Sequence, residues 1–492
     1  MRSALGAASP AVSPDEIAVT GLSLSSGTIR PGDLYAALPG ARTHGARFAR
    51  EAVSSGATAV LTDPTGVDLA GGVGVPVVVV ADPRAVLGAV AALVYGNPAA
   101  DLTLIGITGT QGKTTTSYLV NAGLAAAGTS TAIVGTMGTW IGGRPVGSTL
   151  TTPEAPDLHA LFAVMREEGV QTCVMEVSSH ALVLGRVDGV RYDLAVFTNF
   201  GRDHLDFHHT VEEYFAAKAS LFTPERSRRA LLNVDDPAVA RLAADPRVPT
   251  ATFSPSGTAA DWTCRGVEMS ATGSTFVVTG PAATSVPAAV RLAGRFNVAN
   301  ALCALAAIGE IGGEVSAGAA GIASYLAVAG RMERIDRGQP FAVLVDYAHK
   351  PDAVAATLGA LRPVTEGRLT IVLGAGGDRD AGKRPLMGEI AARLADVLVV
   401  TDDNPRSEDP AAIRRAVIAG VPADAGATVL EIGDRYTAIR TALAAARPGD
   451  TVVIAGKGHE TGQYVGDEVL AFDDRAVAAE ILDQLAASGA AS

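Results

Sequence analysis

The sequence predicts a three-domain α/β protein built on mostly parallel sheets, and three observations support that prediction. The chain has 492 residues, more than one ordinary domain holds. Runs of β-branched residues alternate with Gly- or Asp-rich turns and helical stretches, which is the pattern of βαβ units. Polar motifs mostly follow the carboxyl ends of the predicted strands, the edge at which open parallel sheets bind ligands.

The expected domain boundaries are 1–98, 99–329 and 330–492. The first domain holds two short strands and ends at a Gly-Asn-Pro turn. The second opens with a strand and closes with an Ala-rich helix, and the third contains four strands. The ranges expected for these elements are strands at 58–61, 76–80 and 102–107, a helix at 300–311, and strands at 342–345, 369–373, 397–401 and 452–455.

Composition excludes several classes of protein. The formal net charge of −12 argues against a general nucleic-acid binder, which needs a basic face. The three cysteines, Cys173, Cys264 and Cys303, form no CxxC pattern, so neither a disulfide framework nor a zinc site is expected. No apolar run reaches the roughly 18–20 residues of a membrane span, and the N-terminus lacks a signal peptide's apolar core. We therefore expect a cytoplasmic protein without membrane insertion.

The strongest motif is GITGTQGKTTT, which lies between a predicted strand and a predicted helix. Its backbone N–H groups can approach phosphate oxygens, Lys113 can reach the outer phosphates, and the Thr114 hydroxyl can bind Mg²⁺. Ile107 stands where the strict phosphate-loop pattern has its first Gly. A tight turn with a chance Lys-Thr pair is the alternative, and the strand–loop–helix context argues against it. The motif predicts a binding site for a nucleoside triphosphate.

Three further residues of the second domain are candidates for a metal centre. Glu176 ends a buried strand, and a carboxylate beside a triphosphate is a natural Mg²⁺ ligand, although alone it fits an ordinary strand end equally well. His204 could bind a second cation, or it could be a hydrogen-bonded structural residue. Lys218 shares a predicted apolar helix face with Val211, Tyr214, Phe215 and Phe222. A lysine pointing inward shifts towards the neutral amine, which can add CO₂ to form a carbamate; snorkelling to solvent is the alternative.

Charged motifs also follow the strands of the third domain. Arg379 and Arg406 end two strands of one predicted sheet and could grip a carboxylate with bidentate geometry. Glu460 could bind an ammonium group. The three side chains facing one crevice would suit a zwitterionic amino acid with an extra carboxylate, whereas weak loop salt bridges are the alternative reading.

In their order along the chain these motifs resemble the Mur ligase family over nearly the whole sequence. The segments are GTQGKTT, TTPE, EVSSH, NFGRDHLDFH, EEYFAAK with Lys218, GRFNVANAL, GRMER, DYAHKP, GGDRDAGKRP, DDNPR and GKGHE. Each is weak alone, and the ordered set is highly specific. The resemblance implies a UDP-binding N-terminal domain, a central P-loop-type ATPase domain with a mostly parallel sheet, and a C-terminal Rossmann-like domain that binds the amino acid.

The resemblance implies an ATP- and Mg²⁺-dependent ligase of peptidoglycan precursor synthesis, expected as a monomer. ATP would phosphorylate the D-Glu γ-carboxylate of UDP-N-acetylmuramoyl-L-alanyl-D-glutamate, and the amine of meso-2,6-diaminopimelate would displace phosphate. In this family the DNPR form goes with diaminopimelate, whereas lysine-adding relatives lack that Arg. The alternatives are a ligase of the same fold adding L-lysine, a folylpolyglutamate-synthetase-like ligase and a P-loop switch or motor.

The resemblance also implies roles for individual residues. The catalytic residues would be Lys113, Glu176, His204 and Lys218, and the metal site would be Thr114, Glu176, His204 and carbamylated Lys218. ATP would be held by Gly109, Thr110, Gln111, Gly112, Lys113, Thr114, Thr115, Asn297, Asn300, Arg331 and Asp346. The UDP-muramyl dipeptide would contact Ser26, Thr151, Thr152, Ser178 and Arg186. Diaminopimelate would contact Arg379, Asp403, Asn404, Pro405, Arg406, Gly456 and Glu460. The sequence departs from the family in Gln111, where Asn is common, and in the segment Ser25, Ser26, Gly27, where Asp-Ser-Arg is usual.

Overall fold

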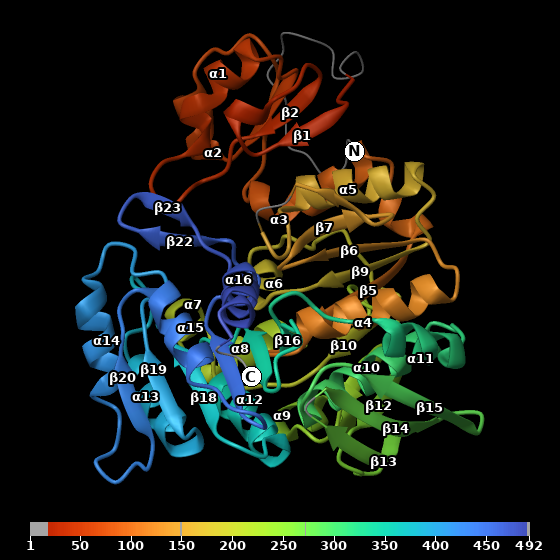
Figure 1. Cartoon of the computed structure of the whole chain (residues 1–492). Coiled ribbons are helices and arrows are strands. Elements are labelled where there is room, and N and C mark those ends of the chain that lie inside the picture. The colour runs from red at the N-terminus through yellow and green to blue at the C-terminus, as the bar shows by residue number, and fades with distance from the viewer. Residues whose placement is uncertain (1–17, 148–149, 271, 490–492) are drawn as a thin grey trace. The chain divides into compact units, whose positions relative to one another are not determined.

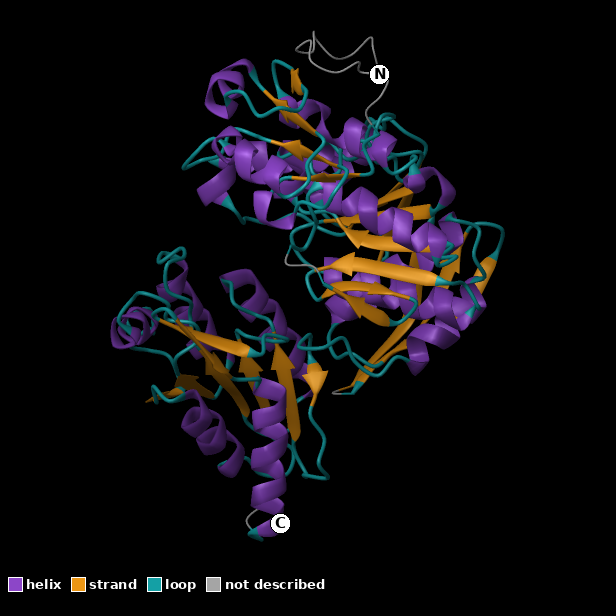
Figure 2. Ribbon diagram, turned by 90° about the horizontal axis from the view of Figure 1, so that it is seen from above, coloured by secondary structure: helices purple, strands orange, loops and turns teal. Residues whose placement is uncertain are grey.

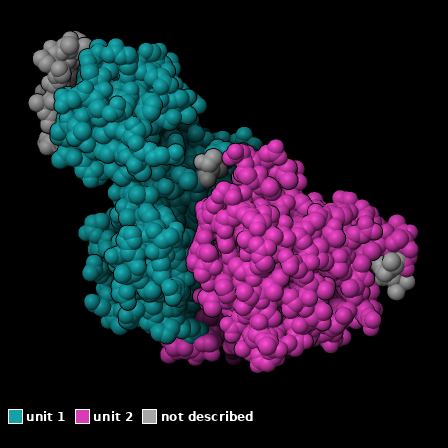
Figure 3. Space-filling view, turned by 90° about the vertical axis from the view of Figure 1, so that its left-hand side faces the viewer, with its two compact units in different colours: residues 1–254, 306–314 teal, residues 255–305, 315–492 magenta. Residues whose placement is uncertain are grey.

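The computed structural model describes residues 18–147, 150–270 and 272–489 (Figure 1). The chain divides into two compact units, coloured separately in Figure 3. Unit 1 comprises residues 1–254 and 306–314, and unit 2 comprises residues 255–305 and 315–492. None of the helices in the described ranges combines the length and the apolar character needed to cross a bilayer.

Unit 1 begins with a four-stranded parallel sheet in the order β1-β2-β3-β4. Successive residues of β2 enter opposite cores, because side chains of a strand alternate between the two faces. Leu34 and Ala36 join one core, and Tyr35 and Ala37 join the other. The elements are β1 (Gly21–Ser23), η2 (Ser26–Thr28), β2 (Asp33–Ala36), η3 (Gly45–Phe48), α1 (Ala49–Ser54), β3 (Ala59–Thr62), α2 (Pro64–Ala70), β4 (Val77–Val79) and α3 (Pro83–Val94).

The larger sheet of unit 1 runs in the order β12-β11-β10-β5-β9-β6-β7-β8. Its strands are parallel from β12 to β6, and β7 and β8 are antiparallel additions. The strands are β5 (Thr103–Thr108), β6 (Thr131–Gly135), β7 (Gly138–Ile141), β8 (Arg144–Val146), β9 (Thr172–Glu176), β10 (Leu194–Phe197), β11 (Ala230–Asn233) and β12 (Thr250–Ser254). The helices are η4 (Pro98–Asp101), α4 (Lys113–Ala126), α5 (Ala155–Glu167), α6 (Ser179–Val183), α7 (Leu205–His208), α8 (Val211–Ala219) and α9 (Pro237–Ala244).

The position of β5 organises this sheet. It lies between β9 and β10, and the register pairs Ile107 with Glu176 on one side and Thr108 with Phe197 on the other. The carboxyl ends of three parallel strands therefore meet at one edge. Ligands of open α/β sheets bind at such an edge, where neighbouring strands lead into loops that separate.

Unit 2 opens with an antiparallel three-stranded meander, followed by two helices. These elements are β13 (Trp262–Ser270), β14 (Gly273–Gly280), β15 (Thr284–Val290), α10 (Arg295–Glu310, whose last turn falls in unit 1) and α11 (Val315–Ser324).

The main sheet of unit 2 runs in the order β16-β17-β21-β18-β19-β20, with only β16 antiparallel. Helices cover both of its faces (Figure 2). In β18, Leu369, Ile371 and Leu373 join the core with α12, α13 and α14, whereas Val372 joins the core with α15 and α16. The elements are β16 (Glu333–Arg334), β17 (Ala342–Asp346), α12 (Pro351–Leu361), η5 (Arg362–Val364), β18 (Leu369–Leu373), α13 (Lys383–Leu394), β19 (Val397–Val400), α14 (Pro410–Ile418), β20 (Thr428–Glu431), α15 (Arg435–Ala444), β21 (Thr451–Ala455), β22 (Gly462–Val465), β23 (Glu468–Ala471) and α16 (Asp474–Ala487).

The seven strands expected from the sequence are all present, with ends shifted by one or two residues at most. The helix expected at 300–311 is wrong at its start, because α10 already begins at Arg295. The sheet that contains the four strands expected after residue 330 also has two edge strands, β16 and β20, which were not predicted. The domain boundaries expected at 98 and 329 stay predictions.

Candidate active site

The glycine-rich loop follows the buried strand β5 and leads into α4. Gly109 and Gly112 have φ values of +148° and +82°, a region in which a side chain strains the backbone. A Cβ at Gly109 would lie 1.9 Å from Thr198 Oγ1, so only glycine lets the loop pass this close to the end of β10. Gly112 gives α4 no side-chain cap, and the helix directs its partial positive charge at the loop, which suits phosphate oxygens.

The segment after β10 fixes the backbone of this loop. Gln111 N donates to Asn199 Oδ1 at 2.9 Å, and Asn199 Nδ2 donates to Gln111 O at 3.1 Å. Thr198 Oγ1 also donates to Gln111 O, at 2.6 Å. Because these contacts use the main chain of Gln111, the loop conformation does not depend on whether Gln or Asn stands there.

Two lysines converge on one carbonyl oxygen of the loop. Lys113 Nζ donates to Gly109 O at 2.8 Å and to Thr110 O at 3.1 Å, and Lys218 Nζ donates to Gly109 O at 2.9 Å. Lys218 is only 1% exposed, and its Nζ lies 4.7 Å from the centre of the Tyr214 ring. The structure confirms that Lys218 points inward.

The helix face predicted around Lys218 is partly wrong. Val211 is 36% exposed, and Phe222 lies beyond the end of α8, at Ala219. Tyr214 and Lys218, four residues apart on α8, do share a buried face. The Tyr214 part of the predicted face is therefore confirmed, and the Gly109 carbonyl and the Tyr214 ring both contact the ammonium.

Glu176 ends β9 beside Ile107, and its side chain is fully buried. Its Oε1 accepts a hydrogen bond from Thr136 N at 2.9 Å, and its Oε2 accepts one from Thr136 Oγ1 at 3.0 Å. A Cβ at Gly135 would lie 2.4 Å from Glu176 Oε1. The turn after β6 therefore fixes this carboxylate close to the end of β5.

His204 lies near the same sheet edge in a cluster of rings. Its Nε2 is 3.2 Å from Asp203 Oδ2, its side chain is 41% exposed, and its ring centre is 4.8 Å from that of His180. Burial lowers the pKa of His180, while the carboxylates of Asp206 and Asp203 oppose that shift. Among the described residues, no group of three or more His, Cys, Asp or Glu side chains is placed to hold a metal ion.

Four of the residues expected to bind the muramyl substrate lie together near the carboxyl end of β9. Thr152 Oγ1 donates to Glu176 O at 2.8 Å and accepts from Ser178 N at 3.2 Å. Arg186 Nη1 donates to Thr152 O at 3.4 Å, and Thr151 Oγ1 lies 3.3 Å from Thr136 Oγ1. Ser26 is elsewhere in unit 1, at the start of η2.

In unit 2, Asp346 ends β17 and is held by three donors. Its Oδ2 accepts from Met332 N at 2.8 Å, and its Oδ1 accepts from Ala348 N at 3.1 Å and from Thr357 Oγ1 at 3.0 Å. Burial raises the pKa of this carboxyl, although Arg331 and these hydrogen bonds oppose the shift.

The other unit 2 residues expected around ATP lie on α10 and beside β17. Arg331 places its guanidinium carbon 4.4 Å from the centre of the Tyr347 ring. Asn300 Nδ2 donates to Asn297 Oδ1 at 3.1 Å, one turn apart on α10.

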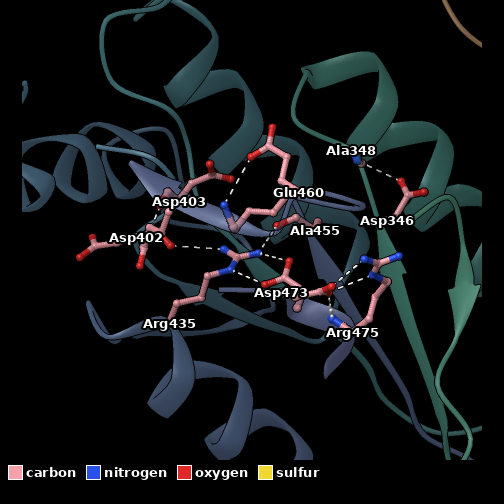
Figure 4. A network of polar contacts seen from close by, with 12 residues as sticks. Asp346, Ala348, Asp402, Asp403, Arg435, Ala455, Glu460, Asp473 and Arg475 are labelled. Atoms are coloured by element: carbon pink, nitrogen blue, oxygen red, sulfur yellow. Dashed lines mark hydrogen bonds and ion pairs between the residues drawn. The ribbon is translucent and has the colours of Figure 1, made fainter. Parts of the chain in front are cut away.

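The carboxyl ends of β19 and β21 bring together residues expected at the amino-acid site. Asn404 Nδ2 donates to Glu460 Oε2 at 2.8 Å. Asp403 is buried against Gly456, where a Cβ would lie 2.3 Å from its Oδ2. Burial raises the pKa of Asp403, and the cations of Arg435 and Lys457 oppose this shift. Figure 4 shows Asp403, Arg435 and Glu460.

Arg379 and Arg406 flank Gly376. A Cβ there would lie 2.9 Å from Arg406 Nη1 and 3.9 Å from Arg379 Cγ. Arg406 Nη1 donates to Gly377 O at 2.8 Å, and Arg379 Nη1 donates to Asp378 O at 2.9 Å. The carbonyl of Pro405 packs against Gly377, where a Cβ would lie 1.9 Å from it. Two guanidinium groups therefore lie at one strand-end loop.

Three segments of the chain match known domain families. Residues 18–95 match the Mur ligase family, catalytic domain; residues 107–308 match the Mur ligase middle domain; residues 330–458 match the Mur ligase, glutamate ligase domain.

The chain belongs to the Mur ligase family.

Its relatives cover nearly all of this Mur ligase. It is 53% identical over 484 residues to the UDP-N-acetylmuramoyl-L-alanyl-D-glutamate–2,6-diaminopimelate ligase of Streptomyces avermitilis, spanning 98% of this chain and 95% of the relative. It is 50% identical to the ligase of the same name from Corynebacterium glutamicum, spanning 95% and 92%. A solved structure of a ligase of that name is 32% identical, with a TM-score of 0.69 over 95% of both chains. The comparison confirms the predicted three-domain α/β fold class.

Sequence reasoning missed several side chains that shape the sites of this Mur ligase. Thr136 holds Glu176, and Asn199 holds the phosphate loop. Lys457 lies within GKGHE and contacts both Asn404 and Glu460. Motif position could have singled out Asn199 and Lys457, whereas Thr136 has no sequence signal, because it follows a strand that carries no polar motif.

Proposed function

We propose that this Mur ligase joins the amine of meso-2,6-diaminopimelate to the D-Glu γ-carboxylate of UDP-N-acetylmuramoyl-L-alanyl-D-glutamate at the expense of ATP, in peptidoglycan precursor synthesis. The observation that carries the proposal is 53% identity across 98% of the chain with a ligase bearing that name. The pairing of Arg379 and Arg406 beside Gly376 supports it, because two guanidinium groups suit an amino acid with a second carboxylate.

ATP and Mg²⁺ fit the residues present in unit 1. We propose that the loop from Gly109 to Thr115 holds the phosphates, because the backbone there is drawn close to β10 by a glycine that no other residue could replace. Mg²⁺ would be held by Thr114, Glu176, His204 and a carbamate on Lys218, and it would neutralise charge on the phosphates. The burial of Lys218 supports the carbamate, since desolvation favours the neutral amine that adds CO₂.

The remaining roles follow the same proposal. The cluster of Thr151, Thr152, Ser178 and Arg186 beside Glu176 would position the D-Glu carboxylate, and Ser26 would contact the UDP group. In unit 2, Asn297, Asn300, Arg331 and Asp346 would contact the nucleotide, and Arg379, Asp403, Asn404, Pro405, Arg406, Gly456 and Glu460 would contact diaminopimelate. The boundaries 1–98, 99–329 and 330–492, the monomeric state and the cytoplasmic location remain part of this proposal.

The reaction brings two anions together, the D-Glu carboxylate and the γ-phosphate of ATP. A carboxylate oxygen of D-Glu attacks the γ-phosphorus and ADP leaves, which gives an acyl phosphate. The amine nitrogen then attacks the acyl carbon, loses a proton, and phosphate leaves. Phosphoryl transfer of this kind depends mainly on positioning and charge neutralisation. The convergence of Lys113 and Lys218 on the loop and the fixed carboxylate of Glu176 supply groups for both tasks.

The test is ADP release measured with each substrate omitted in turn. We expect turnover only when ATP, Mg²⁺, the UDP-muramyl dipeptide and diaminopimelate are all present. L-Lysine and a folate-linked glutamate acceptor serve as competing substrates, for the two ligase alternatives. ADP release at full rate without the muramyl substrate would refute the proposed ligase activity. Equal use of L-lysine would refute the proposed preference for diaminopimelate.

A further inference from the structure

Lys457 is a fully buried lysine of unit 2 for which no role has been given so far. It directly follows Gly456 after β21 and is 0% exposed. Its Nζ lies 3.1 Å from Asn404 Oδ1, 2.5 Å from Gly462 O and 3.4 Å from Glu460 Oε2. An ammonium has three hydrogens to donate, and here it meets three acceptors. Its burial is therefore compensated by contacts to residues expected around the amino acid.

The contacts of Lys457 dictate how Asn404 is turned. Asn404 Oδ1 accepts from Lys457 Nζ and also from Tyr464 N, at 3.0 Å. Because both partners are donors, the carbonyl side of the amide must face them, and the NH₂ side must point the other way. That side donates to Glu460 Oε2 at 2.8 Å. The ammonium and the Tyr464 N–H thus select the same orientation of the amide, and the amide in turn holds Glu460.

The composition of the chain shows that a lysine at this place is not incidental. Only five of its 39 basic residues are lysine, and arginine supplies all the others. All five lie in the motifs that carry the resemblance, at positions 113, 218, 350, 383 and 457. A planar guanidinium with its donors in a fixed fork cannot reproduce a compact head that reaches three acceptors in different directions.

We propose that Lys457 is a positioning residue of the amino-acid site: its ammonium fixes the Asn404 amide and, through it and by direct contact, the carboxylate of Glu460. Lys457 itself is buried and does not touch the amino acid. It sets the direction of the two side chains that would receive the ammonium end of diaminopimelate. The inference rests on the proposed function in naming diaminopimelate.

The test uses Lys457→Met and Lys457→Arg in the full chain. We expect the KM for diaminopimelate to rise roughly ten- to a hundredfold in both variants, because a charge-assisted hydrogen bond and the amide orientation are lost. The KM values for ATP and for the UDP-muramyl dipeptide should stay within about twofold of wild type. The phosphate loop and the Thr152 cluster belong to unit 1. Within unit 2 the hydrogen bonds of Lys457 go to Asn404, Glu460 and Gly462, and not to the residues proposed to contact the nucleotide. Lys457→Arg retains the charge and therefore serves if Lys457→Met is not recovered folded.

Arg362→Met is the matched control. Arg362 lies at the opposite, amino-terminal edge of the same sheet, where it pairs with Asp396 at 2.7 Å and donates to Thr365 O and Gly367 O. Its loss removes a comparable number of polar contacts from unit 2 without touching Asn404 or Glu460. A general loss of stability would raise all three KM values of Lys457→Met together, whereas positioning predicts a selective rise in the KM for diaminopimelate in the Lys457 variants alone.

A second measurement does not require turnover. Hydrogen exchange of the Tyr464 amide should accelerate in Lys457→Met and not in Arg362→Met, because its acceptor, Asn404 Oδ1, is free to turn away. Unchanged exchange, KM values that rise together, or a Lys457→Arg variant with wild-type KM for diaminopimelate would overturn the inference. If the wild type prefers another amino acid, the proposed function fails, and the KM ratio for that amino acid still tests Lys457.

Discussion

Lys218 carries a buried ammonium whose Nζ lies 2.9 Å from the Gly109 carbonyl oxygen. If this amine is carbamylated during catalysis, Lys218→Ala should lower kcat at least about a hundredfold, the typical effect of removing one preorganised charged group. Added formate or acetate should recover part of the rate, because a short carboxylate can enter the space left by the side chain. The measurement is ADP release at saturating substrates, with and without the added acid.

Lys113→Ala is the control for this rescue. Lys113 approaches the same carbonyl oxygen, but its expected role is that of a cation beside phosphates, which a carboxylate cannot replace. Recovery by formate in both variants alike would mean a nonspecific salt effect. A Lys218→Ala enzyme that acetate and formate leave inactive would contradict the carbamate.

Arg406 tests the choice of amino acid. Its Nη1 donates a hydrogen bond to Gly377 O, in the loop that also carries Arg379. Diaminopimelate differs from L-lysine by one carboxylate, and leaving a charged group unpaired costs about 1.5–3 kcal/mol. Arg406→Ala should therefore lower kcat/KM for diaminopimelate roughly ten- to a hundredfold, with little change for L-lysine or in the KM for ATP.

Two further variants test the role of the Arg406 guanidinium. Arg406→Lys should not restore diaminopimelate use, because an ammonium lacks the planar fork of the guanidinium. Arg393→Ala, which removes an exposed arginine paired with Glu389 on α13, should leave both amino acids unaffected. If Arg406→Ala weakened both amino acids equally, Arg406 would not be the residue that selects the second carboxylate.

Single-residue chemistry could be predicted from the sequence wherever a motif names its residue type. Lys113, Glu176 and Glu460 are predicted in this way, and their roles stay predictions. The contact that holds Glu176 could not be predicted, because Thr136 reaches it from a separate strand end and belongs to no motif. Such contacts depend on strand order, which alternating apolar runs do not determine.

At the scale of elements, the connection from β5 to α4 depends on one glycine. A Cβ at Gly109 would lie 1.9 Å from Thr198 Oγ1, and the φ of +148° is unfavourable for any side chain. Forcing a methyl group into such a site typically costs about 1–3 kcal/mol. Gly109→Ala should therefore weaken binding of a nonhydrolysable ATP analogue at least about tenfold, as measured by calorimetry.

Gly72→Ala provides the comparison within unit 1. A Cβ at Gly72 meets nothing within 4 Å. The Gly72→Ala variant should therefore bind the ATP analogue as tightly as wild type does. Wild-type affinity in Gly109→Ala would mean that the loop can move away from β10 at no cost, and the glycine would then have no role in phosphate binding.

The buried strands were predictable because their residues are apolar on both faces, as in β18. The edge strands were not, since β16 has two residues and β20 is half exposed along its length. The polar start of α10, with Asn297 and Asn300, likewise hid the true first turn of that helix. In the main sheet of unit 2, pattern reasoning thus located the core strands and missed the edge strands.

At the scale of the whole molecule, acid should destabilise unit 2. Burial lowers the pKa of His349 to about 3 and that of His459 to about 4. The unfolded chain, with ordinary histidines near pH 6.5, binds more protons than the folded chain between these limits. Stability is therefore fully present above pH 6.5 and falls as the pH drops towards 4, by up to about 1.4 kcal/mol per pH unit for each histidine.

Urea unfolding in a Trp140→Phe background measures this effect. Trp262 then remains as the fluorescent reporter, and it belongs to unit 2. His349→Gln should reduce the slope of the unfolding free energy against pH between pH 6.5 and 4. The reduction should correspond to about one proton fewer taken up on unfolding. A slope that is the same with and without His349 would mean that this histidine titrates normally in the folded protein.

The carbonyl oxygen of Gly109 accepts from two ammonium groups, at 2.8 and 2.9 Å. Two like charges at one acceptor repel each other. Adding CO₂ to Lys218 would reverse the sign of one of them and still leave its nitrogen one hydrogen with which to hold the bond, so the repulsion would become attraction. Lys113 would then favour the modified form of its neighbour. If Lys218 is carbamylated in this way, the fraction of active enzyme would depend on the concentration of dissolved CO₂.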